Sequence, residues 1–148
     1  MDHDEATQVA SRAVERLRLA EARLARRRQT DCGPSETARA AMRFVWEKSD
    51  AGDNATPTEI AEHVGISTPS VTSMLNRLHA GGMISFIPNP ADGRSKLVVP
   101  YDRSVHPDEI DPLGASIRSF AEDLGPDEAA VVAQFVERLI AAIDLECT

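Results

Sequence analysis

Arg94 and Lys96 lie beside a tight-turn signal in the stretch NPADGRSKLVV, residues 89–99. Asp92-Gly93 favours a β-turn, because glycine accepts a positive φ and aspartate hydrogen-bonds to its own backbone. A turn that meets only water needs no cations, so this pair indicates an anionic ligand; the alternative is ordinary solvated turn chemistry. Apolar residues on both sides predict two strands around a loop of roughly eight residues, with Ile84, Phe86 and Ile87 leading into Pro88 and Leu97 to Val99 leading out.

A second group of polar side chains lies just upstream, on one face of a predicted helix. The apolar residues recur at i, i+3, i+4 and i+7, and no acidic side chain occurs between Ser70 and Arg77. Hydroxyl, amide and guanidinium groups can donate to phosphates and to base edges in a major groove. The alternative is a helical hairpin with a plain solvent face, where Glu and Lys are more usual than Ser and Thr. The polar face comprises Ser70, Thr72, Ser73, Asn76 and Arg77, opposite Val71, Met74, Leu75 and Leu78.

Capping signals predict the two short helices that carry this face. Residues 56–59, TPTE, form a capping box with proline at the first helical position, and Gly65 ends that helix in a left-handed turn followed by a buried Ile66. Thr68 is then predicted to cap the second helix, which Gly81-Gly82 ends. Two short helices joined by such a turn form a helix-turn-helix. A hairpin directly after it is a wing, whose arginine can enter a minor groove.

Three further helical regions surround this motif. Residues 5–29 form a long helix with one modest apolar stripe, and Ser35 caps a second helix that ends within residues 50–54 and contains Trp46 as a packing anchor. After them, Leu113, Ile117, Phe120 and Leu124 form a stripe, and a final helix follows Gly125-Pro126. The apolar face of this final helix is wider than a single packing contact requires, so we expect the face to be buried against another chain. That face comprises Val131, Val132, Phe135, Val136, Leu139, Ile140 and Ile143.

The length, hydrophobic content and charge distribution of the chain restrict the kinds of protein that it can be. With 148 residues, 42% of them hydrophobic, the chain has enough material for one ordinary domain with a sizeable core. Its net charge of −8 comes from residues 99–148, which hold eleven acidic and three basic side chains, so the remainder is neutral. Residues 12–28 hold seven arginines against two glutamates, most simply as a solvated helix face. The charge distribution therefore permits a nucleic-acid partner without proposing one.

Several classes of protein and site are disfavoured. No apolar run approaches the roughly 18 residues of a membrane span, and the acidic N-terminus is unlike a secretory signal, so we expect a cytoplasmic protein with no membrane partner. Cys32 and Cys147 lack disulfide or zinc spacing. His63 and His79 read as surface or capping residues, and no histidine pattern or glycine-rich phosphate loop indicates a catalytic residue, a metal or a cofactor. The sequence predicts that the protein is not an enzyme.

Taken together, residues 56–99 resemble the winged helix-turn-helix of the MarR family of bacterial transcriptional regulators. The resemblance rests on TPTEIAEHVGISTPSVTSMLNRLHAGGMI followed by NPADGRSKLVV, in which Asp92-Gly93-Arg94 matches the Asp-x-Arg pattern common in that family's wing. It implies that Arg94 reaches the minor groove and that Asp92 helps to hold Arg94. Arg77 and Gly82 also fit the family, whereas Ser73 stands where an arginine is frequent.

The resemblance implies a mostly α fold with a small β-hairpin, divided into an N-terminal dimerisation helix at 1–34, a winged helix-turn-helix DNA-binding domain at 35–104 and C-terminal dimerisation helices at 105–148. It further implies a homodimer that represses transcription from a pseudo-palindromic double-stranded DNA operator. A small, often aromatic, effector or a thiol oxidation, for which Cys32 is the candidate, would lower DNA affinity. The expected DNA-binding residues are Thr68, Ser70, Thr72, Ser73, Asn76, Arg77, Asp92, Arg94 and Lys96. A winged helix that binds proteins instead of DNA is the alternative.

Overall fold

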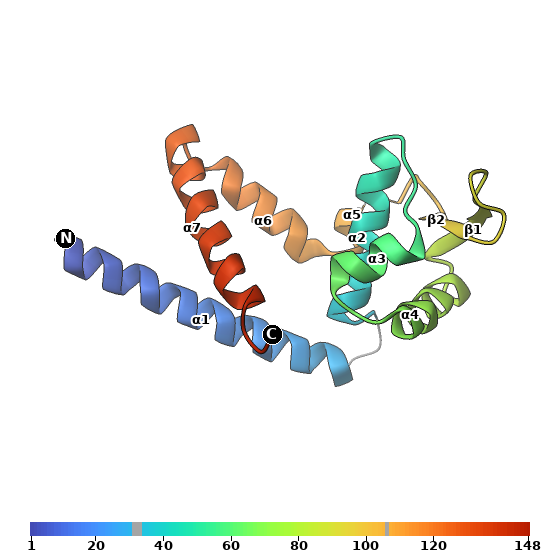
Figure 1. Cartoon of the computed structure of the whole chain (residues 1–148). Helices are drawn as coiled ribbons and strands as arrows, with labels where there is room; N and C mark the ends of the chain where they lie inside the picture. The colour runs from blue at the N-terminus through green and yellow to red at the C-terminus, as the bar shows by residue number, and fades with distance from the viewer. Residues whose placement is uncertain (31–33, 106) are drawn as a thin grey trace. The chain divides into compact units, whose positions relative to one another are not determined.

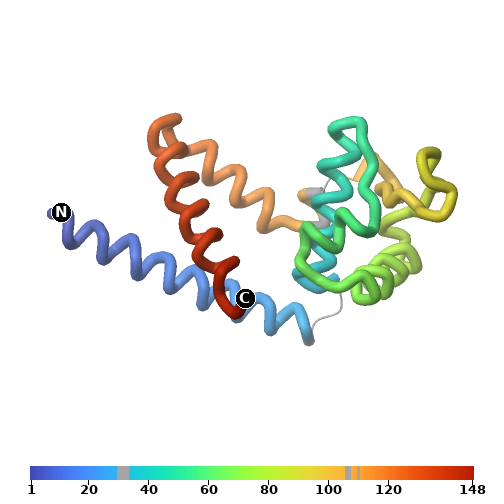
Figure 2. Tube along the Cα trace, viewed as in Figure 1, coloured from blue at the N-terminus to red at the C-terminus, as the bar shows by residue number. Residues whose placement is uncertain are grey.

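The computed structural model describes residues 1–30, 34–105 and 107–148 (Figures 1 and 2). It is mostly helical with one two-stranded antiparallel sheet, as the sequence predicts. The chain divides into two compact units, residues 1–107 and 108–148. In chain order the elements are α1 (His3–Thr30), α2 (Glu36–Asp50), α3 (Pro57–Val64), α4 (Thr68–Ala80), β1 (Ile84–Pro88), β2 (Lys96–Pro100), α5 (Pro107–Ile110), α6 (Pro112–Glu122) and α7 (Pro126–Asp144).

The caps of α2 and α3 follow the sequence prediction. The Ser35 hydroxyl accepts a hydrogen bond from the Ala38 backbone N–H at 3.2 Å. At the start of α3, the Thr56 hydroxyl accepts from the Glu59 N–H at 3.1 Å and the Glu59 carboxylate accepts from the Thr56 N–H at 3.2 Å. This reciprocal capping box satisfies two backbone donors that a helix start leaves without a partner. Gly65 ends α3 at φ 73°, a left-handed conformation that favours glycine.

The cap of α4 is Ser67, so the prediction of Thr68 was wrong by one residue. Ser67 has extended backbone angles, and its hydroxyl accepts from the Ser70 N–H at 3.3 Å. Thr68 is already the first helical residue, and its carbonyl accepts from the Thr72 hydroxyl at 3.0 Å. Serine and threonine are both good caps, and adjacent hydroxyls therefore leave a one-residue ambiguity in the sequence.

The hairpin has the predicted strands. β1 and β2 pair antiparallel from Ile84 opposite Pro100 to Pro88 opposite Lys96, which leaves a loop at residues 89–95. The other edge of β2 is also engaged, because the Val98 N–H donates to the Ala55 carbonyl at 2.8 Å. This contact ties the wing to the residue just before the cap of α3. We call residues 84–100 the wing and residues 89–95 the wing loop.

The core of the first unit lies among α2, α3, α4 and the hairpin. The side chains of Met42, Ile60, Leu75 and Ile84 are among its largest fully buried groups. Each such side chain contributes roughly 1.5–3 kcal/mol relative to an exposed position. Ile66, predicted to be buried, is only half-buried. The remaining buried apolar residues are Ala38, Ala41, Val45, Trp46, Ala55, Ala61, Val71, Met74, Leu78 and Val98.

The segment after β2 returns to α2 through two polar anchors. The Trp46 indole N–H donates to the Val105 carbonyl at 2.9 Å. The Arg103 guanidinium donates to the Ser49 hydroxyl and carbonyl, each at 2.9 Å, near the end of α2. Trp46 is buried and has its polar atom satisfied, as expected of a packing anchor.

The second unit contains α6 and α7, whose apolar faces stay open to solvent. No residue of either helix is buried, and Phe120 is 69% and Val131 65% exposed. An ion pair between Arg118 and Asp108 links α6 to the short helix α5, which the sequence did not predict because a four-residue helix has no apolar period. In the described part of the chain, no helix is long and apolar enough to cross a membrane.

Candidate nucleic-acid interface

The predicted polar face of α4 is exposed along its whole length. Val71, Met74, Leu75 and Leu78 turn into the core, so the five polar side chains on the opposite side face solvent. Neither α4 nor its cap carries an acidic residue, so nothing on this helix repels a phosphate. We call this set the recognition face; it comprises Ser70, Thr72, Ser73, Asn76 and Arg77.

Local hydrogen bonds leave different parts of the recognition face available. The Ser67 hydroxyl donates to the Ser70 oxygen at 2.9 Å, so the Ser70 proton is still able to donate elsewhere. Thr72 donates its proton to the Thr68 carbonyl and therefore offers an acceptor and a methyl group. Within the described ranges, Asn76 and Arg77 make no side-chain hydrogen bond or ion pair. An amide and a guanidinium with free donors suit adenine and guanine edges respectively.

The wing loop is closed by its own side chains. The Asp92 carboxylate accepts from the Arg94 backbone N–H at 3.0 Å, and the Asn89 amide donates to the Ser95 hydroxyl at 3.0 Å. Asp92, Gly93 and Arg94 are exposed at the tip, whereas Asn89 and Ser95 are half-buried at the base. The loop thus presents the Arg94 guanidinium to solvent from a hydrogen-bonded backbone. Figure 1 shows this loop, in dark yellow, beyond the ends of β1 and β2.

A groove joins the recognition face to the wing. It has a volume of about 580 Å³ and lies among the start of α3, one side of α4 and the wing. Five predicted site residues line it: Thr72, Asn76, Asp92, Arg94 and Lys96. The other four, Thr68, Ser70, Ser73 and Arg77, are exposed on α4 outside this lining. The structure therefore brings wing and helix residues together although about 20 positions separate them in the chain.

Besides the capping residue Thr56, three polar residues line the groove that were not among the predicted site residues. Thr58, Asn89 and Ser95 line it with the predicted residues. Thr58 follows a cap, where hydroxyls are common, and Asn89 precedes a proline, where turn residues are common. The residue types of Thr58, Asn89 and Ser95 therefore indicate helix starts and turns. Only the folded structure brings these residues to the same groove as Arg94.

Aromatic contacts fix Lys96 relative to the end of α4. The Lys96 ammonium lies 5.5 Å from the centroid of the Phe86 ring, and the His79 ring centroid lies 5.1 Å from that of Phe86. His79 Nδ1 is 3.1 Å from the Ile84 carbonyl oxygen, so this nitrogen carries a proton and donates. The two contacts of His79 connect α4 to β1 of the wing. Lys96 is held beside the groove with its charge accessible.

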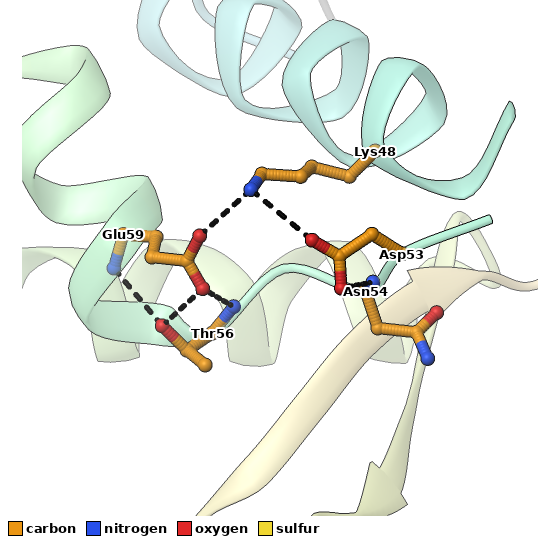
Figure 3. A network of polar contacts seen from close by, with 5 residues as sticks. All are labelled: Lys48, Asp53, Asn54, Thr56 and Glu59. Atoms are coloured by element: carbon orange, nitrogen blue, oxygen red, sulfur yellow. Dashed lines mark hydrogen bonds and ion pairs between the residues drawn. The ribbon is translucent and has the colours of Figure 1, made fainter. Parts of the chain in front are cut away.

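A charged network surrounds the cap of α3 (Figure 3). The Lys48 ammonium lies 3.0 Å from Glu59 Oε2 and 3.5 Å from Asp53 Oδ2. The hydrogen bond from Lys48, together with those from Thr56, lowers the pKa of Glu59, and Glu59 in turn raises the pKa of Lys48. The pKa of Asp53 is lowered first by the Asn54 backbone N–H and then by Lys48. The network therefore stabilises the ionised form of the capping carboxylate.

A second cavity lies on the other side of α4. It has a volume of about 520 Å³, and its lining combines apolar side chains of α2 and α4 with the guanidinium groups of Arg28 and Arg77. Cys32, the candidate for thiol oxidation, lies outside the described residues. The cavity is lined by Arg28, Gln29, Pro34, Ser35, Ala38, Met74, Arg77, Leu78, Gly81 and Met83.

The chain is similar to known proteins in part of its sequence and in its fold. Residues 42–95 match the family model described as the MarR family. Comparison with curated proteins by sequence gives no match. Among solved structures, the chain is similar to the PcaV transcriptional regulator from Streptomyces coelicolor in complex with its natural ligand, with 20% identity, coverage of 88% of this chain and 91% of that one, and a TM-score of 0.58.

Two structures of DNA complexes are similar as well. FabT from Streptococcus pneumoniae in complex with DNA has 14% identity, coverage of 97% and 98%, and a TM-score of 0.62. The S. aureus MepR–DNA complex has 13% identity, coverage of 86% and 94%, and a TM-score of 0.59. At these identities the structures establish the shared winged-helix fold, and the family model covers its central part. Residues 42–95 thus match the MarR family model, and the chain shares the winged-helix fold of these structures.

Proposed function

We propose that this protein is a sequence-specific, double-stranded DNA-binding transcriptional regulator that acts as a dimer. MarR-family members are transcriptional regulators and not enzymes. The observation that carries the proposal is the groove that Asn76 of α4 lines together with Arg94 and Lys96 of the wing. FabT and MepR, which share the fold, were solved with DNA. A chain that acts on chromosomal DNA works in the bacterial cytoplasm.

The geometry suits a duplex that spans helix and wing. An α-helix fits the major groove, and an arginine on a projecting loop fits the negative potential of the adjacent minor groove. The sugar-phosphate strand that separates the major groove from the minor groove of the DNA would then lie in the protein groove between α4 and the wing. Lys96 and Thr58, which line that groove, would contact its phosphates. Asn76 and Arg77 would read base edges.

The exposed apolar faces support a dimer. Leu17 of α1, Phe120 of α6 and Phe135 of α7 are 57%, 69% and 42% exposed. Faces of this size rarely remain uncovered on a stable soluble protein, and a second copy is the partner that a two-fold operator requires. We therefore propose that residues 1–34 and 105–148 form the dimerisation region and that residues 35–104 form the DNA-binding domain.

The cavity beside Arg77 supports control by a small molecule. Its apolar lining from Ala38, Met74 and Leu78 suits an aromatic ring, and the Arg77 guanidinium suits a carboxylate or phenolate. Arg28, which also lines the cavity, already forms an ion pair with Glu36. Because Arg77 also belongs to the recognition face, an effector there would reach a side chain of the DNA interface. We propose that the protein is a repressor whose DNA affinity falls when a small aromatic effector binds.

A gel-shift titration against the DNA upstream of the protein's own gene tests the proposal. We expect a shifted complex of two protein chains on one pseudo-palindromic site, with weaker binding to an unrelated duplex. Adding benzoate-type and phenol-type compounds should release the DNA at a concentration that also raises the thermal midpoint of the free protein. A protein that binds neither duplex would instead support a winged helix that binds other proteins.

A further inference from the structure

The wing loop is closed by hydrogen bonds of Asn89 and Ser95, two residues outside the predicted site. Asn89 begins the loop and Ser95 ends it, and both are half-buried while the tip between them is exposed. The Asn89 amide nitrogen donates to the Ser95 hydroxyl at 3.0 Å, which closes the base of the loop. The Asn89 side-chain oxygen accepts from the Ala91 backbone N–H, also at 3.0 Å. One side chain therefore holds both the first turn and the far end of the loop.

The backbone completes this closure. The Asn89 carbonyl accepts from the Asp92 N–H at 3.2 Å, and the Asp92 carbonyl accepts from the Ser95 N–H at 3.1 Å. The Asp92 carboxylate accepts from the Arg94 N–H at 3.0 Å. The backbone donors of Ala91, Asp92, Arg94 and Ser95 are thus all satisfied inside the loop. The backbone on both sides of Arg94 is therefore held by hydrogen bonds within the loop.

We propose that Asn89 is a positioning residue for DNA binding, which acts by fixing the wing loop so that Arg94 is presented in advance. The inference rests on the proposed function, because it concerns how the same groove binds its duplex. A loop that is ordered before binding loses less conformational entropy when Arg94 is placed in the minor groove. Asn89 itself needs no contact with DNA for this effect. Ser95 is its partner at the other end of the loop.

The first test measures the free protein. Amide hydrogen exchange followed by NMR should show protected N–H groups at Ala91 and Ser95 in the wild type. Asn89→Ala should accelerate exchange at these two positions by at least about fivefold, while the amides of β1 and β2 are unchanged. Ser95→Ala removes the other end of the clamp and should act in the same direction. Equal exchange rates in the wild type and both variants would overturn the inference, whether or not the protein binds DNA.

The second test measures operator affinity in double-mutant cycles. Asn89→Ala alone should weaken binding about three- to tenfold, the range expected when a hydrogen-bonded arrangement is lost. In an Arg94→Ala background the same change should have almost no effect, because no arginine remains to be positioned. Combined with Asn76→Ala on α4, the matched control, the two losses should multiply. An equal loss from Asn89→Ala with and without Arg94 would mean that Asn89 contacts DNA directly, and this positioning role would be wrong.

The hydrogen-exchange test and the binding test distinguish a failure of this inference from a failure of the proposed function. A wild-type protein that binds no duplex contradicts the DNA-binding proposal, while the exchange rates still decide whether Asn89 orders the loop. A wild type that binds its operator, with Arg94→Ala weakened and Asn89→Ala unaffected, contradicts the positioning role alone.

Discussion

The carboxylate of Asp92 holds the backbone of Arg94, through a hydrogen bond of 3.0 Å from the Arg94 N–H to Asp92 Oδ1. The resemblance implied that Asp92 helps to hold Arg94, and the structure gives this role a specific form. Across the described residues, no ion pair joins the Asp92 carboxylate to the Arg94 guanidinium. The guanidinium is therefore available to a ligand while its backbone is fixed.

This relationship predicts opposite results for two substitutions of Asp92. Asp92→Ala removes the acceptor and should weaken operator binding several-fold, by about the 0.5–1.5 kcal/mol of one hydrogen bond. Asp92→Asn keeps an oxygen acceptor for the Arg94 N–H and removes a negative charge near phosphates, so its affinity should equal or exceed that of the wild type. Fluorescence anisotropy with labelled operator measures both. Equal losses in the two variants would show that the charge, not the hydrogen bond, is what matters.

Lys96 should contribute through its charge. Its ammonium lies over the Phe86 ring at the edge of the groove. Removing one phosphate contact reduces the slope of log affinity against log salt by about one unit. We expect this change for Lys96→Ala with operator and with unrelated duplex alike, and no such change for Lys96→Arg. A slope identical to that of the wild type would place Lys96 away from the DNA backbone.

Asn76 and Arg77 should determine sequence preference. Each has free donors on the exposed side of α4, and a side chain that contacts a base contributes about 1–3 kcal/mol. Asn76→Ala and Arg77→Ala should therefore weaken operator binding while leaving binding to unrelated duplex nearly unchanged. Glu47→Gln, on the exposed side of α2, is the control. Footprints and affinities that do not change in either variant would show that another face of the protein meets the DNA.

Acid should destabilise the fold in part through Glu59. Its folded-state pKa lies below the ordinary 4.5 because Lys48 and Thr56 hydrogen-bond to the carboxylate. A lowered pKa stabilises the fold fully above the unfolded-state value, and this contribution is lost as the pH falls from about 4.5 through the folded-state pKa. Glu59→Gln should therefore reduce the difference in urea midpoint between pH 7 and pH 3. An unchanged pH dependence would mean that the network in Figure 3 adds nothing to stability.

The C-terminal helix should control oligomeric state. Phe135 and Ile140 lie on the exposed apolar face of α7, at 42% and 45% exposure. Replacing either by Asp should convert a dimer to a monomer in analytical ultracentrifugation at micromolar concentration, because the charge would have to be buried in the interface. Glu137→Lys, on the same helix but outside the apolar stripe, serves as the control. A wild-type monomer at that concentration would contradict the dimer.

Local sequence signals were sufficient for most of the fold. The capping box at Thr56, Gly65 and the apolar period of α4 each rest on near neighbours in the chain, and the structure has all three. The cap of α4 was misplaced because Ser67 and Thr68 are equally suitable by type. The groove was not predictable in the same way, since it joins Thr58, Asn76 and Asn89 through tertiary packing. The closure of the wing loop by Asn89 and Ser95 likewise depends on the register of β1 with β2.

Binding of duplex DNA in the groove between α4 and the wing should depend on Arg94 and on salt concentration. Operator affinity should be measured by fluorescence anisotropy from about 50 to 200 mM salt for the wild type and Arg94→Ala. We expect steep salt dependence for the wild type and weaker binding by Arg94→Ala to operator and unrelated duplex alike, with the larger loss at low salt. Binding that is the same for both proteins at every salt concentration would contradict DNA binding in this groove.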